Sequence, residues 1–190
     1  DPVPATEARA AMATYPGLVS HPFPTCFSCG TGRAEGDGLR IFPGPVGSTH
    51  DGTAESSAAL PADGTGRRVA ATWTPHRSVG EDWHTYADDR PRASVAATWA
   101  ALDCVGGWAG DLTERLMVLG RMAARVDTLP VMGEEHVVVG EKRGQDGRKT
   151  FTASTPKRCR GYRPTFSRPS SNSATACAPR PKGPASATWC

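Results

Sequence analysis

Apolar and small residues recur with a helical period between Ser94 and Gly110, in the stretch SVAATWAALDCVGGWAG. Apolar side chains return there at intervals of three and four residues, which predicts one face of an α-helix. They are Val95, Trp99, Leu102 and Ala109. A second stripe of this predicted helix carries almost no side chains and consists of Ala96, Ala100, Asp103, Gly107 and Gly110. Asp103 is the one functional group on that stripe.

Asp103 allows two interpretations. A partner or slender ligand lying on the stripe would remove water from the carboxylate and raise its pKa, and such carboxylates serve as acids, bases or nucleophiles. Alternatively, the small residues allow close packing and Asp103 marks the helix end as a solvated residue. Spacing alone favours this second interpretation.

Runs of alternating or β-branched residues predict strands on both sides of this helix. Before it, the pattern predicts a short helix, two strands and a long surface loop between those strands. These are Glu7–Thr14, Leu39–Phe42, Val69–Thr74 and residues 44–67. After it, the pattern predicts three antiparallel strands, with a hairpin turn at the Asp146-Gly147 pair. These strands are Leu116–Asp127, His136–Glu141 and Lys149–Ser154. This order predicts an α+β fold in which one long helix covers an antiparallel sheet.

The net charge of +3 is distributed unevenly over the 190 residues. Residues 155–190 hold seven Lys and Arg, six Pro, no acidic residue and no Val, Ile, Leu or Met. Burial cannot offset the ordering entropy of such a segment, which predicts a tail. We therefore divide the chain into an N-terminal extension over residues 1–20, a domain over 21–154 and an atypical basic tail over 155–190. The tail includes a degenerate last strand or represents an out-of-frame reading of a GC-rich gene, and the sequence leaves both open.

Composition also limits the partners. No apolar run approaches the roughly 18 residues of a membrane span, and no signal peptide is recognisable at the N-terminus. Six cysteines are too few for a disulfide scaffold, so a reduced cytoplasmic setting is expected. The basic tail lacks the aromatic platforms of a nucleic-acid-binding motif, so we expect neither a membrane nor a nucleic-acid partner.

Cys26 and Cys29 form a C-x₂-C pair, which is half of a tetrahedral zinc site. The other half needs two further ligands, and the sequence offers no second such pair and no close pair of histidines. Redox motifs share this spacing. The favoured interpretation is a tight turn with small, partly buried thiols, so no metal and no cofactor are assigned. His76 and His84 lie in a polar run that is expected to be exposed.

Two segments resemble a known family. CFSCGTGRAEGDGLRIF is similar to the CFxCGxxxxxGLxL segment of hotdog-fold acyl-CoA thioesterase-like proteins, and WAALDCVGGWAG resembles the part of their central helix that carries the catalytic Asp. The likeness covers about residues 21–154 and is nearest to an actinobacterial branch with the pattern WAALDCxGGWA. It implies a hotdog fold, with an antiparallel sheet wrapped around one long helix. It also implies a homodimer or homotetramer that hydrolyses an acyl-CoA thioester at its interface, with Asp103 as the catalytic carboxylate.

The sequence departs from this family at two places. Many active relatives carry His-Gly-Gly at the helix start, where this chain has Ser94, Val95 and Ala96, and a strand Thr or Ser where this chain has Gly120. Main-chain amides at the helix start remain able to polarise a thioester oxygen. The resemblance implies six substrate-contacting residues, namely Ser94, Val95, Ala96, Ala100, Gly106 and Gly107. The alternative is a non-catalytic protein that binds acyl-CoA or another acyl ligand.

Overall fold

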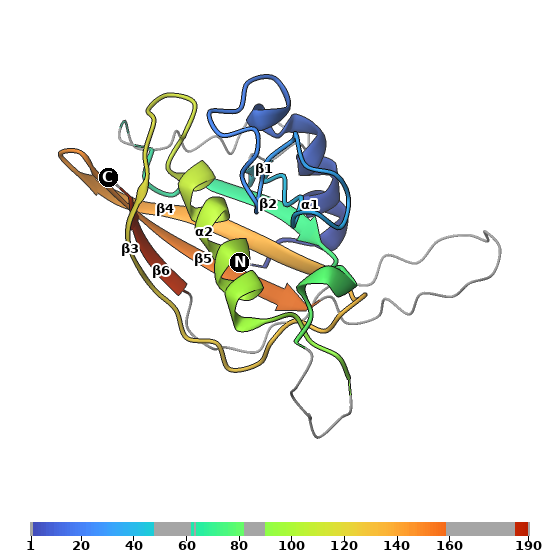
Figure 1. Ribbon diagram of the computed structural model, residues 1–190. Coiled ribbons are helices and arrows are strands. Elements are labelled where there is room, and N and C mark those ends of the chain that lie inside the picture. The colour runs from blue at the N-terminus through green and yellow to red at the C-terminus, as the bar shows by residue number, and fades with distance from the viewer. Residues whose placement is uncertain (1, 48–61, 63, 82–89, 159–184, 190) are drawn as a thin grey trace.

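The computed structural model describes residues 2–47, 62, 64–81, 90–158 and 185–189. These residues form an α+β fold built on a six-stranded antiparallel sheet with the strand order β1-β2-β4-β5-β6-β3 (Figure 1). The strands are β1 (Gly44–Val46), β2 (Arg68–Trp73), β3 (Leu119–Ala123), β4 (His136–Asp146), β5 (Lys149–Arg158) and β6 (Ala185–Trp189). The α-helices are α1 (Ala5–Ala11) and α2 (Val95–Ala109), and three short 3₁₀ turns lie at Met12–Thr14, Pro16–Leu18 and Arg77–Val79.

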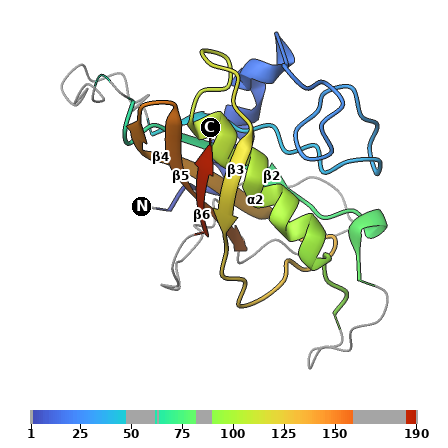
Figure 2. The same cartoon turned by 60° about the vertical axis from the view of Figure 1, so that its left-hand side comes forward.

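The two α-helices pack on opposite faces of the sheet. Successive residues of a strand point to opposite faces, and the two hydrophobic clusters follow this alternation. Val69 and Ala71 belong to the larger cluster, which contains α2, whereas Ala70 belongs to the smaller cluster, which contains α1. In Figure 2, α2 extends across the sheet on the face that carries the larger cluster. The main core therefore lies between α2 and the sheet.

The boundaries of α2 confirm the helix predicted over Ser94–Gly110. Ser94 is the N-cap and its side chain accepts a hydrogen bond from the Ala97 N–H at 3.1 Å, while Gly110 is the C-cap. Such a cap satisfies one of the helix-start donors that have no partner within the helix. The helix has 15 residues and is therefore about 22 Å long.

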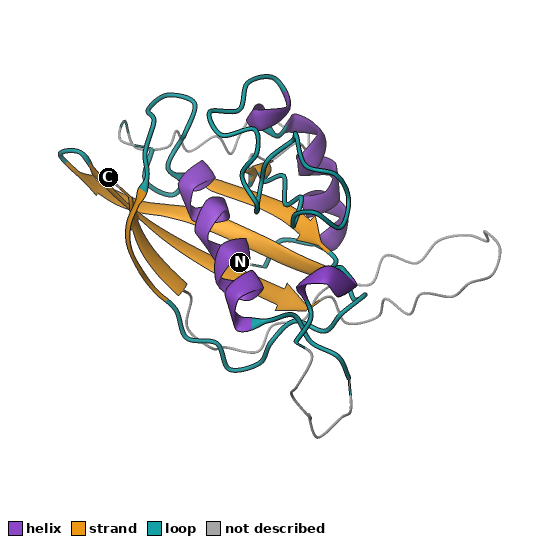
Figure 3. Ribbon diagram, viewed as in Figure 1, coloured by secondary structure: helices purple, strands orange, loops and turns teal. Residues whose placement is uncertain are grey.

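The buried face of α2 includes Leu102 and Ala109 of the predicted apolar stripe but not the first residue of that stripe. Val95 is 48% exposed, whereas Ala97, Ala101, Val105 and Trp108 are almost completely buried. Two neighbours cover adjacent sides of the helix: the sheet and the loop between the second 3₁₀ turn and β1 (teal in Figure 3). Because that loop buries a side of the helix that the sheet does not reach, the buried sector is rotated relative to the predicted stripe.

Two predicted segments before α2 are wrong. Leu39–Phe42 is not a strand, because Arg40 adopts a left-handed backbone conformation with φ of 52° that interrupts extended structure. Only two backbone hydrogen bonds attach it to the preceding loop, from Leu39 N–H to Phe27 and from Ile41 N–H to Ser28. The strand β1 lies instead at Gly44–Val46, inside the segment predicted as a loop.

The strand predicted over Val69–Thr74 occurs as β2, one residue earlier, and the three strands predicted after α2 occur with different lengths. The strand predicted over Leu116–Asp127 contracts to the five residues of β3, whereas β4 and β5 each extend beyond their predicted ends. They meet at the predicted Asp146-Gly147 turn, where Gly147 has a φ of 54°. Gly tolerates this conformation without a steric penalty.

The C-terminal residues complete the sheet. Ala185–Trp189 forms β6, which pairs with β5 on one side and β3 on the other. Most of the predicted tail, much of the predicted loop over 44–67, and His84 lie outside the described residues. Within the described residues, no helix has the length and apolar character needed to cross a membrane.

Candidate functional site

Asp103 lies on α2 with one carboxylate oxygen buried and unpartnered. Its Oδ1 atom has no hydrogen-bond partner among the described residues. Burial, together with the smaller effect of the neighbouring negative charge of Cys26, raises the pKa of Asp103 to about 6. The carboxylate is therefore partly removed from water without a compensating donor. A buried polar atom in this condition is unusual and needs a structural or functional explanation.

Among the residues that the structure describes, the start of α2 offers one backbone donor without a hydrogen-bond partner. The Val95 N–H donates to the Glu81 carboxylate at 3.0 Å, and the Ala97 N–H donates to Ser94 Oγ at 3.1 Å. Among the described residues, the Ala96 N–H has no such partner. Ala96 is also exposed, so a ligand could reach this amide.

The predicted substrate-contacting residues are not gathered at one place. Val95 and Ala96 lie at the exposed start of α2, whereas Gly106 and Gly107 are buried near its end. Asp103 lies eight residues after Val95, which is about 12 Å along the helix axis. A single reacting atom therefore cannot contact both the helix-start amides and Asp103 of one chain.

Two further positions from the sequence analysis, Ala100 and Gly120, lie in different surroundings. Ala100 is half-buried, and its carbonyl accepts a hydrogen bond from the Ser28 hydroxyl at 2.5 Å. Gly120 is exposed and lies in β3 where the register shifts between Leu119 and Arg121, so it forms a β-bulge against β6. Bulges redirect neighbouring side chains, but Gly120 itself contributes no hydroxyl to a site.

Three cysteines meet beside Asp103, and sequence reasoning found only two of them. The Sγ atoms of Cys26, Cys29 and Cys104 all lie within 4.8 Å of one another, and those of Cys26 and Cys104 are 3.4 Å apart. All three are free thiols, and Cys29 is buried while the other two are half-buried. Cys104 follows Asp103 in α2, so the two candidate features share one helical turn.

A tight turn organises the first two cysteines. The Gly30 N–H donates to the Cys26 carbonyl at 2.9 Å. A Cβ atom at position 30 would lie 2.5 Å from the carbonyl oxygens of both Cys26 and Pro24, which explains why glycine is present. Backbone hydrogen bonding from Cys29 and Ser28 also acts on the Cys26 sulfur and contributes to lowering its pKa. The turn thus directs several donors at one sulfur.

The pKa values of the three thiols depend on the hydrogen bonds among them. Hydrogen bonds from the thiols of Cys104 and Cys29, followed by those from the backbone amides, lower the pKa of Cys26 well below its ordinary value. The hydrogen bonds that Cys104 gives, together with its burial, raise its own pKa. Hydrogen bonding within the cluster therefore favours the ionised form of Cys26 and the protonated form of Cys104.

Aromatic groups enclose the inner side of the cluster. The Trp108 indole N–H donates to Cys29 Sγ at 3.4 Å, and the Tyr15 hydroxyl donates to the Cys29 carbonyl at 3.1 Å. The His21 Nδ1 atom accepts from the Phe23 N–H at 2.9 Å, and Nε2 contacts the Cys29 carbonyl at 3.1 Å. Both nitrogens of His21 therefore already have partners, and burial lowers the pKa of its ring.

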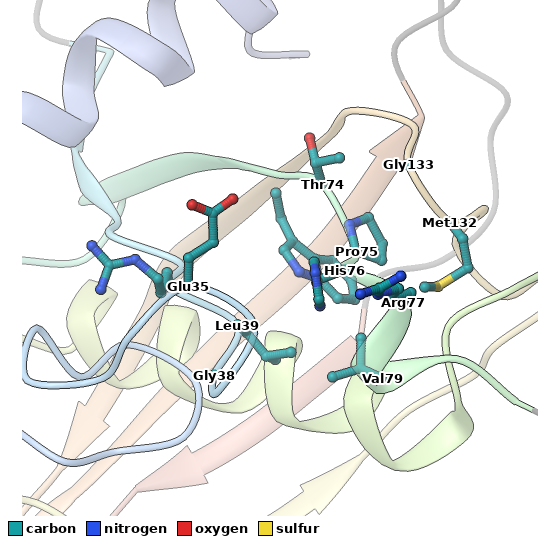
Figure 4. Close-up of a pocket in the computed structure, with 13 residues that line it drawn as sticks. Glu35, Gly38, Leu39, Thr74, Pro75, His76, Arg77, Val79, Met132 and Gly133 are labelled. Atoms are coloured by element: carbon teal, nitrogen blue, oxygen red, sulfur yellow. The ribbon is translucent and has the colours of Figure 1, made fainter.

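A separate cavity of about 560 Å³ opens next to the helix start (Figure 4). Its walls are mainly apolar, from Leu39, Trp73, Pro75, Val79 and Met132, and its charged groups are Glu35, Arg40 and Arg77, with His76 beside them. His76 is exposed, as the sequence predicts. None of the residues predicted to contact substrate lines this cavity. It nevertheless borders the helix start, because the Val79 carbonyl accepts the Ser94 N–H at 2.8 Å.

Comparison with protein-family models, curated proteins and solved structures found no significant match to this chain. The candidate site residue that the sequence pattern did not reveal is Cys104, which is separated from Cys26 by 78 positions. The only available signal was its location directly after Asp103, and that location does not reveal which loop covers it.

Proposed function

We propose that this protein is a hotdog-like protein that binds an acyl-CoA thioester at a dimer interface and hydrolyses it with Asp103. The observation that carries the proposal is the buried, unpartnered Oδ1 atom of Asp103. A ligand carbonyl or an attacking water placed beside this oxygen would give it the partner that the described residues do not provide. The fold supports the proposal, because one helix packs across an antiparallel sheet as the resemblance implies.

The length of α2 argues that two chains would build each site. An oxyanion formed from a thioester needs main-chain donors within hydrogen-bond distance, and Ala96 offers the available amide. Ala96 and Asp103 of one helix are seven residues apart, about 10 Å along its axis. If two α2 helices lie antiparallel across a two-fold axis, Asp103 of one chain faces the helix start of the other.

The edge strand β3 supports such a dimer. It ends the sheet among the described strands, and none of its residues is fully buried. Leu119 in β3 is 37% exposed, and Leu116 and Val118 just before the strand are 64% and 61% exposed. Exposed apolar edge strands readily pair with a second chain. We therefore place the interface along β3 and the neighbouring outer side of α2.

The cavity next to the helix start would bind the coenzyme A part of the substrate. Its apolar walls fit a pantetheine arm, and Arg40 and Arg77 supply positive charge for phosphates. The Arg40 guanidinium already stacks over the Phe42 ring at 5.1 Å. Arg77 is exposed and is the better candidate for direct phosphate contact.

One observation favours binding without turnover as a second candidate. The amides of Val95 and Ala97 are occupied by Glu81 and Ser94, so within the described part of the chain a single helix-start donor remains for an oxyanion. Loss of one oxyanion donor costs about a hundredfold or more in rate in well-studied enzymes. An acyl ligand could still occupy the same groove.

The deciding experiment compares the parent protein with Asp103→Asn on a panel of acyl-CoA substrates, measuring released thiol. The Asn variant keeps the shape of the side chain and removes its charge, so hydrolysis should fall more than about a hundredfold. Glu114→Gln is the matched control, because Glu114 is an exposed carboxylate just beyond the helix, and it should keep parental activity. Equal rates for the parent and Asp103→Asn would make Asp103 structural. If neither protein turns over any thioester but both bind acyl-CoA in calorimetry, the binding function is correct.

A further inference from the structure

The three cysteines beside Asp103 have the arrangement of a metal site. From their geometry we infer that Cys26, Cys29 and Cys104 together bind one Zn²⁺ ion through their sulfur atoms. This inference is independent of thioester hydrolysis, because it concerns different side chains and stands if Asp103 has no catalytic role.

The distances between the sulfurs fit a tetrahedral ion. Zinc–sulfur bonds are about 2.3 Å long, so two sulfurs on one tetrahedral Zn²⁺ lie about 3.8 Å apart. The three Sγ atoms here are all within 4.8 Å of one another, with Cys26 and Cys104 at 3.4 Å. Small side-chain rotations would therefore bring all three to bonding distance without a change in the backbone.

The surroundings of the sulfurs suit thiolates that hold a cation. The tight turn closed by the Gly30 N–H on the Cys26 carbonyl holds Cys26 and Cys29 close together, and the Trp108 indole N–H donates to Cys29 Sγ. Donors of this kind orient metal ligands and stabilise their charge. Three sulfurs this close cannot all carry negative charge without a cation between them, whereas Zn²⁺ would compensate it and release the remaining thiol protons to water.

Zinc is the favoured ion because sulfur-rich tetrahedral sites select Zn²⁺ or iron, and hard cations prefer oxygen ligands. Three protein sulfurs leave a fourth tetrahedral position. Both nitrogens of His21 are already occupied, so His21 is not the fourth ligand in this arrangement. The fourth position falls to water or to an exogenous ligand, a coordination pattern that zinc sites with an open position share.

The cluster also bears on the role of the CFSCG segment. Its C-x₂-C pair would supply two ligands from a loop, and Cys104 a third from α2, so the ion would fasten the loop to the helix. Without an ion, the loop and α2 are joined by the Ser28 hydroxyl on the Ala100 carbonyl, by the Trp108 N–H on Cys29 Sγ, by the contact between Cys26 and Cys104, and by packing. Metal binding would therefore stabilise the folded protein in addition to occupying a site.

The test uses the full 190-residue chain, purified under reducing conditions without chelators. We expect about one zinc per chain by elemental analysis. The metal-free protein titrated with Co²⁺ should develop thiolate-to-cobalt charge-transfer absorption together with the visible bands of a tetrahedral ion. Competition with Zn²⁺ should abolish both signals.

Two variants separate the cluster from the other cysteines. Cys104→Ser should weaken Co²⁺ binding more than about a hundredfold, because losing a direct ligand costs more than losing an outer-shell partner. The control replaces Cys159, Cys177 and Cys190 together by Ser, which keeps the cluster intact and should leave the cobalt spectrum unchanged. Far-ultraviolet circular dichroism checks that both variants fold.

The parent protein alone can overturn the inference, whatever the variants do. Failure to bind Zn²⁺ or Co²⁺ while all three cysteines react as free thiols would refute it. So would a Cys26–Cys104 disulfide found by peptide mapping in protein purified under reducing conditions. A brown iron-containing protein would also reject zinc as the ion.

Discussion

Gly140 of β4 lies directly beneath the backbone of Val105 in α2, and a Cβ atom at position 140 would be 2.4 Å from the Val105 carbonyl oxygen. Such a distance does not occur between real side chains and backbone. The helix therefore approaches the sheet as closely as it does only because residue 140 has no side chain. This contact fixes the height of α2, and with it the location of Asp103 and Cys104, above the sheet.

Gly140→Ala should destabilise the protein by about 1–3 kcal/mol, since a well-packed interface must shift to accept the methyl group. Chemical denaturation would measure the loss. Gly144→Ala is the control in the same strand, because nothing lies within 4 Å of a Cβ at that position. It should change stability by less than about 0.5 kcal/mol. Equal effects from both variants would show that the close approach at Gly140 does not determine stability.

Asp111, the residue after the helix C-cap, should give a pH-dependent contribution to stability. Burial acts to raise its pKa, but hydrogen bonds from Thr113 and the ion pair with Arg67 outweigh burial and hold the pKa below its ordinary value. A lowered folded-state pKa stabilises the protein above the unfolded-state value of about 3.9, and this contribution is lost as the pH falls through the folded-state pKa.

Asp111→Asn should therefore reduce the free energy of unfolding by about 1 kcal/mol at pH 7, and the difference should shrink below about pH 4. Asparagine tolerates the positive φ of 70° at this position, so backbone strain is not introduced. Asp37→Asn serves as the control, because this carboxylate is 64% exposed in its ion pair with Arg33. Denaturation curves at several pH values would test the prediction, and a pH-independent loss would contradict it.

Dimerisation through β3 is tested at Leu119. The single chain has a mass of 20.0 kDa, and light scattering of the parent protein should give twice this value or four times it. Leu119→Lys introduces a charge that disfavours edge-to-edge pairing and should shift the protein to monomer. Val19→Lys is the control, because Val19 is 94% exposed in a different region. A parent protein that remains monomeric at high concentration would eliminate the composite site.

The composite site also predicts complementation between two inactive variants. Asp103→Asn removes the carboxylate, and Ala96→Pro removes the available helix-start amide at a position in the first turn where proline is tolerated. Each should be inactive alone. A mixed dimer would contain one intact site, so equal mixing after subunit exchange should restore about a quarter of the parental sites. Without recovery, and with exchange verified by mass, the two groups would not act across the interface.

A substitution at Arg77 tests whether the cavity next to the helix start binds the phosphates of coenzyme A. Arg77→Ala should raise the KM for acyl-CoA about tenfold, because a hydrogen bond to a charged group is lost. The KM for an acyl thioester of a short phosphate-free thiol should stay constant. Arg9→Ala is a suitable control, because Arg9 is exposed and pairs with Glu135. An equal change for both substrates would remove the proposed phosphate contact.

The sequence by itself determined the elements whose stability is local. The period of three and four residues over Ser94–Gly110 located α2, and the structure has these two residues as its N-cap and C-cap. The alternation at Val69 and the Asp146-Gly147 pair located β2 and the β4–β5 hairpin. In each case residues close in sequence decide the outcome, through capping, side-chain alternation or a turn that requires glycine.

Only the tertiary structure decided which surfaces meet. The left-handed residue Arg40 ended a strand that its neighbours favoured, and the loop it belongs to covered a side of α2 that no local pattern marks. That loop brought Cys26 and Cys29 to Cys104, and it rotated the buried sector of the helix away from Val95. The physical reason is that packing between distant segments depends on the shape of both surfaces, whereas a sequence pattern records the preference of one segment alone.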